Sequence, residues 1–130
     1  MKDQDSQITA TEIRLRTRSR VLEVAFADGS RFALPFEYLR VHSPSAEVQG
    51  HGGAQAVLVL GKQHVIVRAV EPIGHYAVRL VFDDGHDSGL YTWRYLHELG
   101  AQREAKWSAY LARVASHAPG GAGSLEDPGG

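Results

Sequence analysis

Residues 76–99, YAVRLVFDDGHDSGLYTWRYLHEL, carry the signals that decide the fold. The run Tyr76–Phe82 predicts a strand. Asp84-Gly85 predicts a tight hairpin after it, in a type I′ turn that needs positive φ. Thr92 stands where a helix N-cap is expected, before WRYLHEL, and Gly100 where a C-cap is expected. This stretch therefore predicts a strand, a tight turn, a short strand and a helix.

The same order of signals occurs earlier in the chain. Phe26-x-Asp28-Gly29 recurs 56 residues later as Phe82-x-Asp84-Gly85, and Leu34 matches Leu90. The pair Tyr38-Leu39 recurs 57 residues later as Tyr95-Leu96. This faint repeat predicts two similar half-units packed on one core rather than a solenoid.

The remaining elements are predicted from alternation, turn residues and helical spacing. Strands are expected at Thr11–Thr17, Val21–Phe26 and Arg31–Leu34, and Pro35 opens a helical turn. Further along, Ala56–Leu60 and Val65–Val70 predict a second hairpin, with a turn at Pro72-Ile73-Gly74 and a last helix over about Gln102–Ala115. Residues 1–9 are expected to be a flexible N-terminus, residues 10–116 the folded domain, and residues 117–130 a disordered tail rich in Gly and Pro.

Composition excludes several classes of function. The chain has 130 residues, a length typical of one domain. Its formal net charge of −1 gives no electrostatic reason to expect nucleic acid or an anionic membrane as a partner. Cysteine is absent, so thiolate zinc sites, cysteine-ligated iron–sulfur clusters and cysteine nucleophiles are excluded. No apolar run approaches the roughly 20 residues of a membrane helix, and the polar N-terminus is not a secretory signal. These features predict a cytoplasmic protein.

The most unusual segment is the polar loop His42–Gly53, HSPSAEVQGHGG. Long loops inside compact domains often carry function. Its His42, Glu47 and His51 offer nitrogen and oxygen ligands for a metal ion. The alternative is a structural loop in which polar side chains bond to the backbone and glycines permit positive φ; the candidate structural residues are Ser43, Ser45, Gly50 and Gly52.

A second candidate segment is Phe82–Gly89, FDDGHDSG. His86, flanked by carboxylates such as Asp87 at a turn, suits a metal site or a base oriented by an Asp. The alternative is an Asp-Gly turn with exposed polar residues. No nucleophile elbow, P-loop or dinucleotide fingerprint is present, so catalysis and nucleotide binding have no support. Trp93 and Trp107 are expected in the core, with a partner-binding face as the alternative.

The segments LRVHSPSAEVQGHG, GKQHVIVRAVEPIGHYAVRLVFDDGHDSGLYTW and RYLHELG together resemble the gamma-butyrobetaine hydroxylase-like N-terminal domain family. The resemblance covers about Ile8 to Leu111, and in bacteria this domain stands alone, with unknown function. It implies a compact α+β fold dominated by antiparallel strands. In the eukaryotic hydroxylases the domain precedes a separate catalytic domain dependent on 2-oxoglutarate and iron, so the family name implies no activity here. Similarity to a module of chloroplast P-loop proteins that handle iron–sulfur clusters implies an adapter or assembly role.

The resemblance also implies a metal position. The hydroxylase domain holds zinc with three Cys and one His, and the Cys positions fall at Ser43, Ser45 and Val48 of this chain. The ligand His falls at His86. Since serine hydroxyls are poor zinc ligands at neutral pH and valine offers none, the zinc site in its family form is expected to be absent.

The sequence therefore predicts a single α+β domain, a small and mostly antiparallel β-sheet domain with short helices and a C-terminal helix. The first functional hypothesis is a non-catalytic accessory or adapter protein that binds iron or zinc, working near iron or iron–sulfur chemistry, with an unidentified protein partner. The candidate ligands are His86, His51, His42, Glu47 and Asp87. The second hypothesis is a metal-free interaction module, in which hydrogen bonds replace the zinc.

Overall fold

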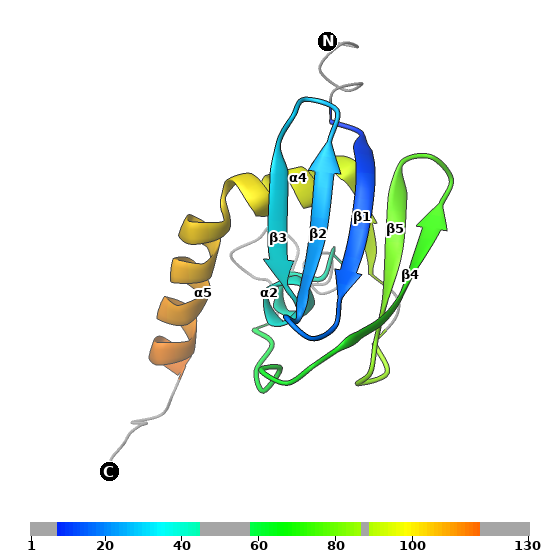
Figure 1. Ribbon diagram of the computed structural model, residues 1–130. Coiled ribbons are helices and arrows are strands. Elements are labelled where there is room, and N and C mark those ends of the chain that lie inside the picture. The colour runs from blue at the N-terminus through cyan, green and yellow to red at the C-terminus, as the bar shows by residue number, and fades with distance from the viewer. Residues whose placement is uncertain (1–7, 45–57, 87–88, 118–130) are drawn as a thin grey trace.

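Figure 1 shows the computed structural model of the chain, which describes residues 8–44, 58–86 and 89–117. Two antiparallel three-stranded sheets form, in the orders β1-β2-β3 and β4-β5-β6, and a helix follows each. The elements are β1 (Ala10–Arg16), β2 (Val21–Phe26), β3 (Arg31–Pro35), α2 (Phe36–Val41), β4 (Val67–Ile73), β5 (Ala77–Phe82), β6 (Leu90–Thr92), α4 (Trp93–Ala101) and α5 (Arg103–His117). The predicted α+β class is confirmed.

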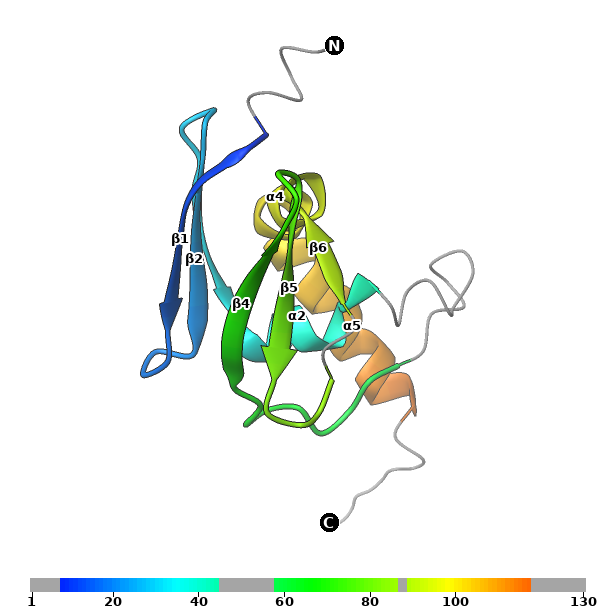
Figure 2. The ribbon, with the colours of Figure 1, turned by 90° about the vertical axis from the view of Figure 1, so that its right-hand side faces the viewer.

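One apolar core joins both sheets to the helices. Leu22 and Val24 of β2 and Leu80 of β5 are fully buried, as the period-two alternation of each strand requires. Leu96 and Leu99 of α4 close the same core, and Figures 1 and 2 show α2 and α4 behind the β1-β2-β3 sheet. Each such side chain contributes roughly 1.5–3 kcal/mol of transfer free energy, so this core holds the two sheets together.

The two halves of the chain repeat each other in three dimensions. The phenol of Tyr38 donates to the carbonyl of Leu99 at 2.6 Å, and the phenol of Tyr95 donates to the carbonyl of His42 at 2.6 Å. Tyr38 and Tyr95 are 57 positions apart, as are His42 and Leu99. The contacts are therefore reciprocal, as across a two-fold axis. The faint sequence repeat marks two β-β-β-α units that bury one core.

Both Asp-Gly hairpins have the same geometry, which is not the predicted type I′. Phe26 N–H donates to the Ser30 carbonyl at 2.9 Å, and Phe82 N–H donates to the His86 carbonyl at 3.0 Å. In each loop only the glycine has positive φ among the described residues, +92° at Gly29 and +91° at Gly85. A type I′ turn needs positive φ at two residues, so each loop is instead a tight turn closed by a left-handed glycine.

The predicted hairpin between residues 56–60 and 65–70 is wrong. Residues 58–60 form no strand, and β4 pairs with β5 instead. The carbonyl of Val59 accepts a hydrogen bond from the Tyr110 phenol at 2.6 Å, so this apolar run is held by α5 rather than by a strand ladder. Short apolar runs carry no period that separates a strand from a buried loop.

Two predicted boundaries also differ. Pro72 lies inside β4 rather than in a turn, opposite Val78, and this is tolerated because β4 is an edge strand. Gly100 is not the C-cap, because α4 ends at Ala101 and Gln102 is its C-cap. The N–H of Gln102 donates to the Glu98 carbonyl. A Cβ at Gly100 would lie 2.3 Å from the Phe32 ring, so packing against β3 requires this glycine. The predicted N-cap is confirmed: Thr92 Oγ1 accepts from Tyr95 N–H at 3.1 Å.

Helix α5 is the least buried element. Tyr110 is its single buried residue, and Figure 1 shows the helix running away from the sheets at the C-terminal end of the described chain. Of the helices in residues 8–44, 58–86 and 89–117, none is long and apolar enough to span a bilayer.

Candidate functional site

The end of α2 meets the turn that follows β5. Ser43 lies just after the C-cap of α2 and is fully buried, and His86 follows Gly85 of the second hairpin. Ser43 Oγ and His86 Nε2 lie 2.8 Å apart, a hydrogen bond whose donor depends on the imidazole tautomer. The beginning of the predicted loop and the predicted turn are therefore neighbours, although they are 43 residues apart in sequence.

The backbone of the hairpin fixes the position of His86. Its N–H donates to Asp84 Oδ1 at 3.1 Å, and its carbonyl accepts from Phe82 N–H at 3.0 Å. The imidazole lies against the Phe82 ring, with 6.1 Å between ring centroids. Because both sides of the residue are bonded, the ring is presented to Ser43 with little freedom.

Asp84 links this hairpin to two other segments. Its Oδ2 accepts from Arg40 Nε of α2 at 2.9 Å and from Lys62 Nζ at 2.7 Å. Partial burial alone would raise the pKa of the Asp84 carboxyl. Hydrogen bonds from Lys62, from the backbone N–H of residue 86 and from Arg40 outweigh the burial and hold this pKa at about 2.

The surroundings of Ser43 are closely packed. A Cβ built at Gly89 would lie 2.7 Å from Ser43 Oγ and 3.1 Å from the Tyr91 ring. The Tyr91 phenol donates to the Leu39 carbonyl of α2 at 2.6 Å. The strand before α4 thus closes over the serine, which explains why Ser43 is buried and why residue 89 is a glycine.

The residues present do not fit the family's zinc ion. Two ligand atoms at about 2.0–2.2 Å from a tetrahedral zinc lie about 3.3–3.6 Å apart. Ser43 Oγ and His86 Nε2 are closer, at direct hydrogen-bond distance, and the hydroxyl is a poor zinc ligand. Ser43 and His86 are the two family ligand positions that lie among the described residues. They form a direct hydrogen bond and are too close together to bind a zinc ion between them.

The other predicted ligands are only partly placed. His42 Nδ1 lies 3.0 Å from the Tyr38 carbonyl, and its ring packs against Tyr38, with centroids 4.7 Å apart. Within the described ranges, no three His, Asp or Glu residues form a group that could hold a metal ion. The metal site stays a prediction, because most of its candidates lie outside the described residues. Those candidates are Glu47, His51 and Asp87, and the loop residues Ser45, Gly50 and Gly52 also lie there.

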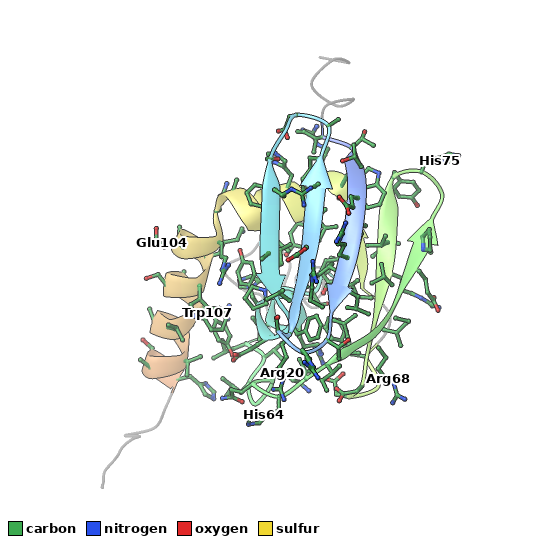
Figure 3. All side chains as sticks on the ribbon, viewed as in Figure 1. Arg20, His64, Arg68, His75, Glu104 and Trp107 are labelled. Atoms are coloured by element: carbon green, nitrogen blue, oxygen red, sulfur yellow. The ribbon has the colours of Figure 1, made fainter. Side chains whose placement is uncertain are left out.

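The two tryptophans have different surroundings. Trp93 Nε1 donates to the His75 carbonyl at 2.8 Å and anchors the β4–β5 turn. Trp107 stacks on Tyr110, with centroids 5.0 Å apart, and borders an open groove of about 640 Å³. The groove also exposes Leu111, 48% accessible, beside Glu104. Trp107 is thus the tryptophan that lies at a surface hollow, and it is labelled in Figure 3.

Sequence reasoning missed the cations around Asp84. Arg40 bonds Asp84 of the second hairpin, and His97 bonds Asp28 of the first hairpin, with 2.9 Å in each case. Arg40 and His97 are 57 positions apart, the offset that relates Tyr38 to Tyr95. Extending the repeat into α2 and α4 would have found both partners.

Comparison with known proteins agrees with the fold. The family described as gamma-butyrobetaine hydroxylase-like, N-terminal, matches residues 13–97. A crystal structure from Acidithiobacillus ferrooxidans, of a protein with unknown function in the DUF971 family, is 46% identical. The match covers 75% of the present chain and 98% of the crystallised protein, with a TM-score of 0.63.

Two NMR solution structures are also similar. One is 50% identical, covering 83% of this chain and 85% of its own, with a TM-score of 0.71. The other is 45% identical, covering 92% and 89%, with a TM-score of 0.74. No curated protein matches the chain. The chain therefore belongs to the gamma-butyrobetaine hydroxylase-like N-terminal family.

Proposed function

We propose that this protein is a non-catalytic adapter that binds another protein, and that the Ser43–His86 hydrogen bond performs the structural task of the family's zinc. The observation that carries the proposal is the 2.8 Å contact between Ser43 Oγ and His86 Nε2. This bond joins the end of α2 to the second hairpin, which are the segments that carry the zinc ligands in the resembling domain. A hydrogen bond between a buried serine and a partly buried histidine rigidifies such a junction without an ion.

The titratable groups support a structural role for this region. The two carboxyls with pKa values near 2, Asp28 and Asp84, both sit in hairpin turns, where hydrogen bonds stabilise their charged forms. Ser43, the hydroxyl next to an imidazole, is fully buried. A nucleophile must reach its substrate, so this pair favours stability rather than catalysis.

The groove beside α5 is the proposed face for the partner. Trp107 and the exposed Leu111 supply the aromatic and aliphatic surface that anchors interfaces, and Glu104 supplies a polar rim. Helix α5 also lies against the body mainly through Tyr110 and Trp107, which leaves its other faces accessible.

Partner capture with matched variants tests this proposal. The intact chain is immobilised, exposed to a lysate of its source cells, and the bound proteins are identified and then purified for a direct binding titration. Leu111→Ser is expected to weaken the purified pair by tenfold or more. Tyr76→Ser, which removes an exposed ring at the far β4–β5 turn, is the control and is expected to bind within twofold of the parent. Equal binding by all three proteins would contradict the proposed face.

A metal-loaded accessory protein is the second candidate. It is favoured by the meeting of the His86 turn with the start of the loop that carries His51 and Glu47. His86 with His42, Glu47, His51 or Asp87 would hold iron or zinc, since imidazole and carboxylate suit both ions. The metal content of the purified protein separates the two candidates.

A further inference from the structure

The positive charges of this protein are unevenly neutralised. Among the described residues, seven lysines and arginines form ion pairs with carboxylates, as Arg16 does with Glu23, and as Arg40 and Lys62 do with Asp84. By contrast, Arg18, Arg20 and Arg68 make no ion pair with any carboxylate in the part of the chain that the structure describes. All three are exposed.

These arginines gather at one end of the molecule. Arg18 and Arg20 lie in the turn between β1 and β2, and Arg68 lies near the start of β4. Arg20 Nη1 is 3.5 Å from His64 Nδ1, which joins a third segment to the group. Figure 3 shows Arg20, His64 and Arg68 together at this end, and Figure 2 shows the β1–β2 turn and the start of β4 at the same end in the rotated view. We call Arg18, Arg20, His64 and Arg68 the basic end.

The backbone presents two of these side chains through irregular conformations. Arg20 has a φ of +60°, in the left-handed region, and it is the single non-glycine residue there among those described. Arg68 is the extra residue of a β-bulge, because Val67 pairs with Phe82 and Ala69 with Val81. Left-handed non-glycine residues and bulges cluster where a side chain must be aimed.

The internal repeat shows that the fold itself does not require these arginines. The carbonyl of Arg20 accepts from Phe36 N–H, and in the other half the carbonyl of Tyr76 accepts from Trp93 N–H, so Tyr76 takes the place of Arg20. The bulge at Arg68 has its counterpart at Thr11, between Ala10 and Glu12. A tyrosine without a positive φ thus makes the carbonyl contact that Arg20 makes, and a threonine occupies the bulge equivalent to that of Arg68, so these two arginine side chains are specific to one end.

The carboxylates near this end leave its charge uncompensated. Asp83 Oδ1 accepts from Ile66 N–H at 3.0 Å, and Asp84 forms ion pairs with Arg40 and Lys62. The half-buried Glu37 of α2 interacts with His64 rather than with the three arginines; burial raises the pKa of its carboxyl, and the charge of His64 lowers it. The exposed surface of the basic end is thus positive, although the whole chain carries −1.

We propose that the basic end binds a carboxylate-rich segment of the partner protein. This inference rests on the proposed adapter function. Guanidinium groups bind carboxylates in bidentate pairs, and unpaired arginines from a turn and a strand can clasp an extended acidic peptide from two sides. Electrostatic complementarity of this kind fixes the orientation of a partner and speeds its association. Nucleic acid is disfavoured because a handful of cations on a net-negative chain gives few phosphate contacts.

A peptide titration tests the proposal. A dye-labelled hexaglutamate peptide is titrated into the intact protein at low salt and followed by fluorescence anisotropy. The parent is expected to bind it with an affinity that falls steeply as salt rises, and Arg18→Gln/Arg68→Gln is expected to bind at least tenfold more weakly. Arg14→Gln/Arg79→Gln removes two exposed arginines elsewhere and is expected to stay within twofold of the parent. Adding Arg20→Asn, which tolerates a left-handed φ, is expected to abolish the remaining binding.

Several outcomes would overturn the inference. The first is that the parent does not bind the peptide. The second is that the Arg14→Gln/Arg79→Gln control loses as much affinity as the basic-end variant. The third is that the parent binds a single-stranded oligonucleotide more tightly than the peptide. A captured partner that binds the basic-end variants and the parent equally would also overturn it, while leaving the adapter function in place. Loss of capture in Leu111→Ser alone bears on the α5 groove, so the two proposals fail separately.

Discussion

Ser43 Oγ lies 2.8 Å from His86 Nε2, and the equivalent hairpin in the other half of the fold forms with a serine in place of this histidine. In the first hairpin the position of His86 is held by Ser30, whose N–H donates to Asp28 Oδ1 as the N–H of His86 donates to Asp84 Oδ1. The imidazole is therefore not needed to build the turn. Its specific contact is the buried serine at the end of α2.

Removing the serine hydroxyl is expected to destabilise the protein. Ser43→Ala removes a hydrogen bond from a partly buried imidazole, so the free energy of unfolding should fall by about 0.5–1.5 kcal/mol. Chemical denaturation measures it. Ser19→Ala, whose hydroxyl is exposed in the turn between β1 and β2, is the control and should cost less than about 0.5 kcal/mol. Equal effects of the two substitutions would mean that the Ser43–His86 bond stabilises nothing.

The Asp84 carboxylate is expected to make the free energy of unfolding fall at low pH. Its pKa lies at about 2 in the folded protein and near 3.8 otherwise, so its contribution is present above pH 4 and is lost as pH falls through 2. Asp84→Asn should cost up to about 2 kcal/mol at pH 7 and should flatten the decline in stability between pH 4 and pH 2. Denaturant titrations across this range measure both effects.

Asp83→Asn is the matched control for Asp84→Asn. Asp83→Asn removes a neighbouring carboxyl from the same hairpin, and an asparagine oxygen at position 83 can still accept from Ile66 N–H. If Asp83→Asn flattened the profile as much as Asp84→Asn, the assignment of the acid dependence to the Arg40–Asp84–Lys62 network would be wrong.

A methyl group at Gly100 is expected to destabilise α4. Alanine is favoured over glycine in a helix by about 1 kcal/mol, but a Cβ here would lie 2.3 Å from the Phe32 ring. Overpacking costs typically 1–3 kcal/mol, so Gly100→Ala should lower the thermal midpoint. Combining it with Phe32→Leu should recover part of the loss, as a double-mutant cycle will show. A gain in stability from Gly100→Ala alone would contradict the packing.

Particular residues show how far the sequence could predict the fold. Thr92 was correctly identified as an N-cap because capping is local chemistry, and the strands at 21–26 and 31–34 follow from alternation and Asp-Gly turns. The predicted strand is wrong at residues 58–60, while residues 56 and 57 lie outside the described residues; the sequence does not reveal that the phenol of Tyr110 bonds the Val59 carbonyl. Gly100 was interpreted as a cap because Phe32, which requires it, lies far away in sequence.

One contact of the candidate site can be compared with the sequence, because most of its predicted ligands lie outside the described residues. The resemblance correctly places Ser43 opposite His86. The Asp84 cations and the basic end were missed because ion pairing depends on which side chains tertiary folding brings together. Arg68 is exposed at a β-bulge, and no local pattern in the segment VIVRAV predicts that bulge.

Metal analysis of the purified full chain decides whether the Ser43–His86 bond stands in for an ion. Protein prepared without chelators and supplied with iron and zinc is measured by elemental analysis, with His86→Gln and His86→Ala beside it, and its thermal unfolding is recorded with and without EDTA. We expect far less than one metal ion per chain and a thermal midpoint that EDTA does not move. About one iron or zinc ion per chain, lost in both His86 variants and removed by EDTA with a fall in the midpoint, would contradict this expectation.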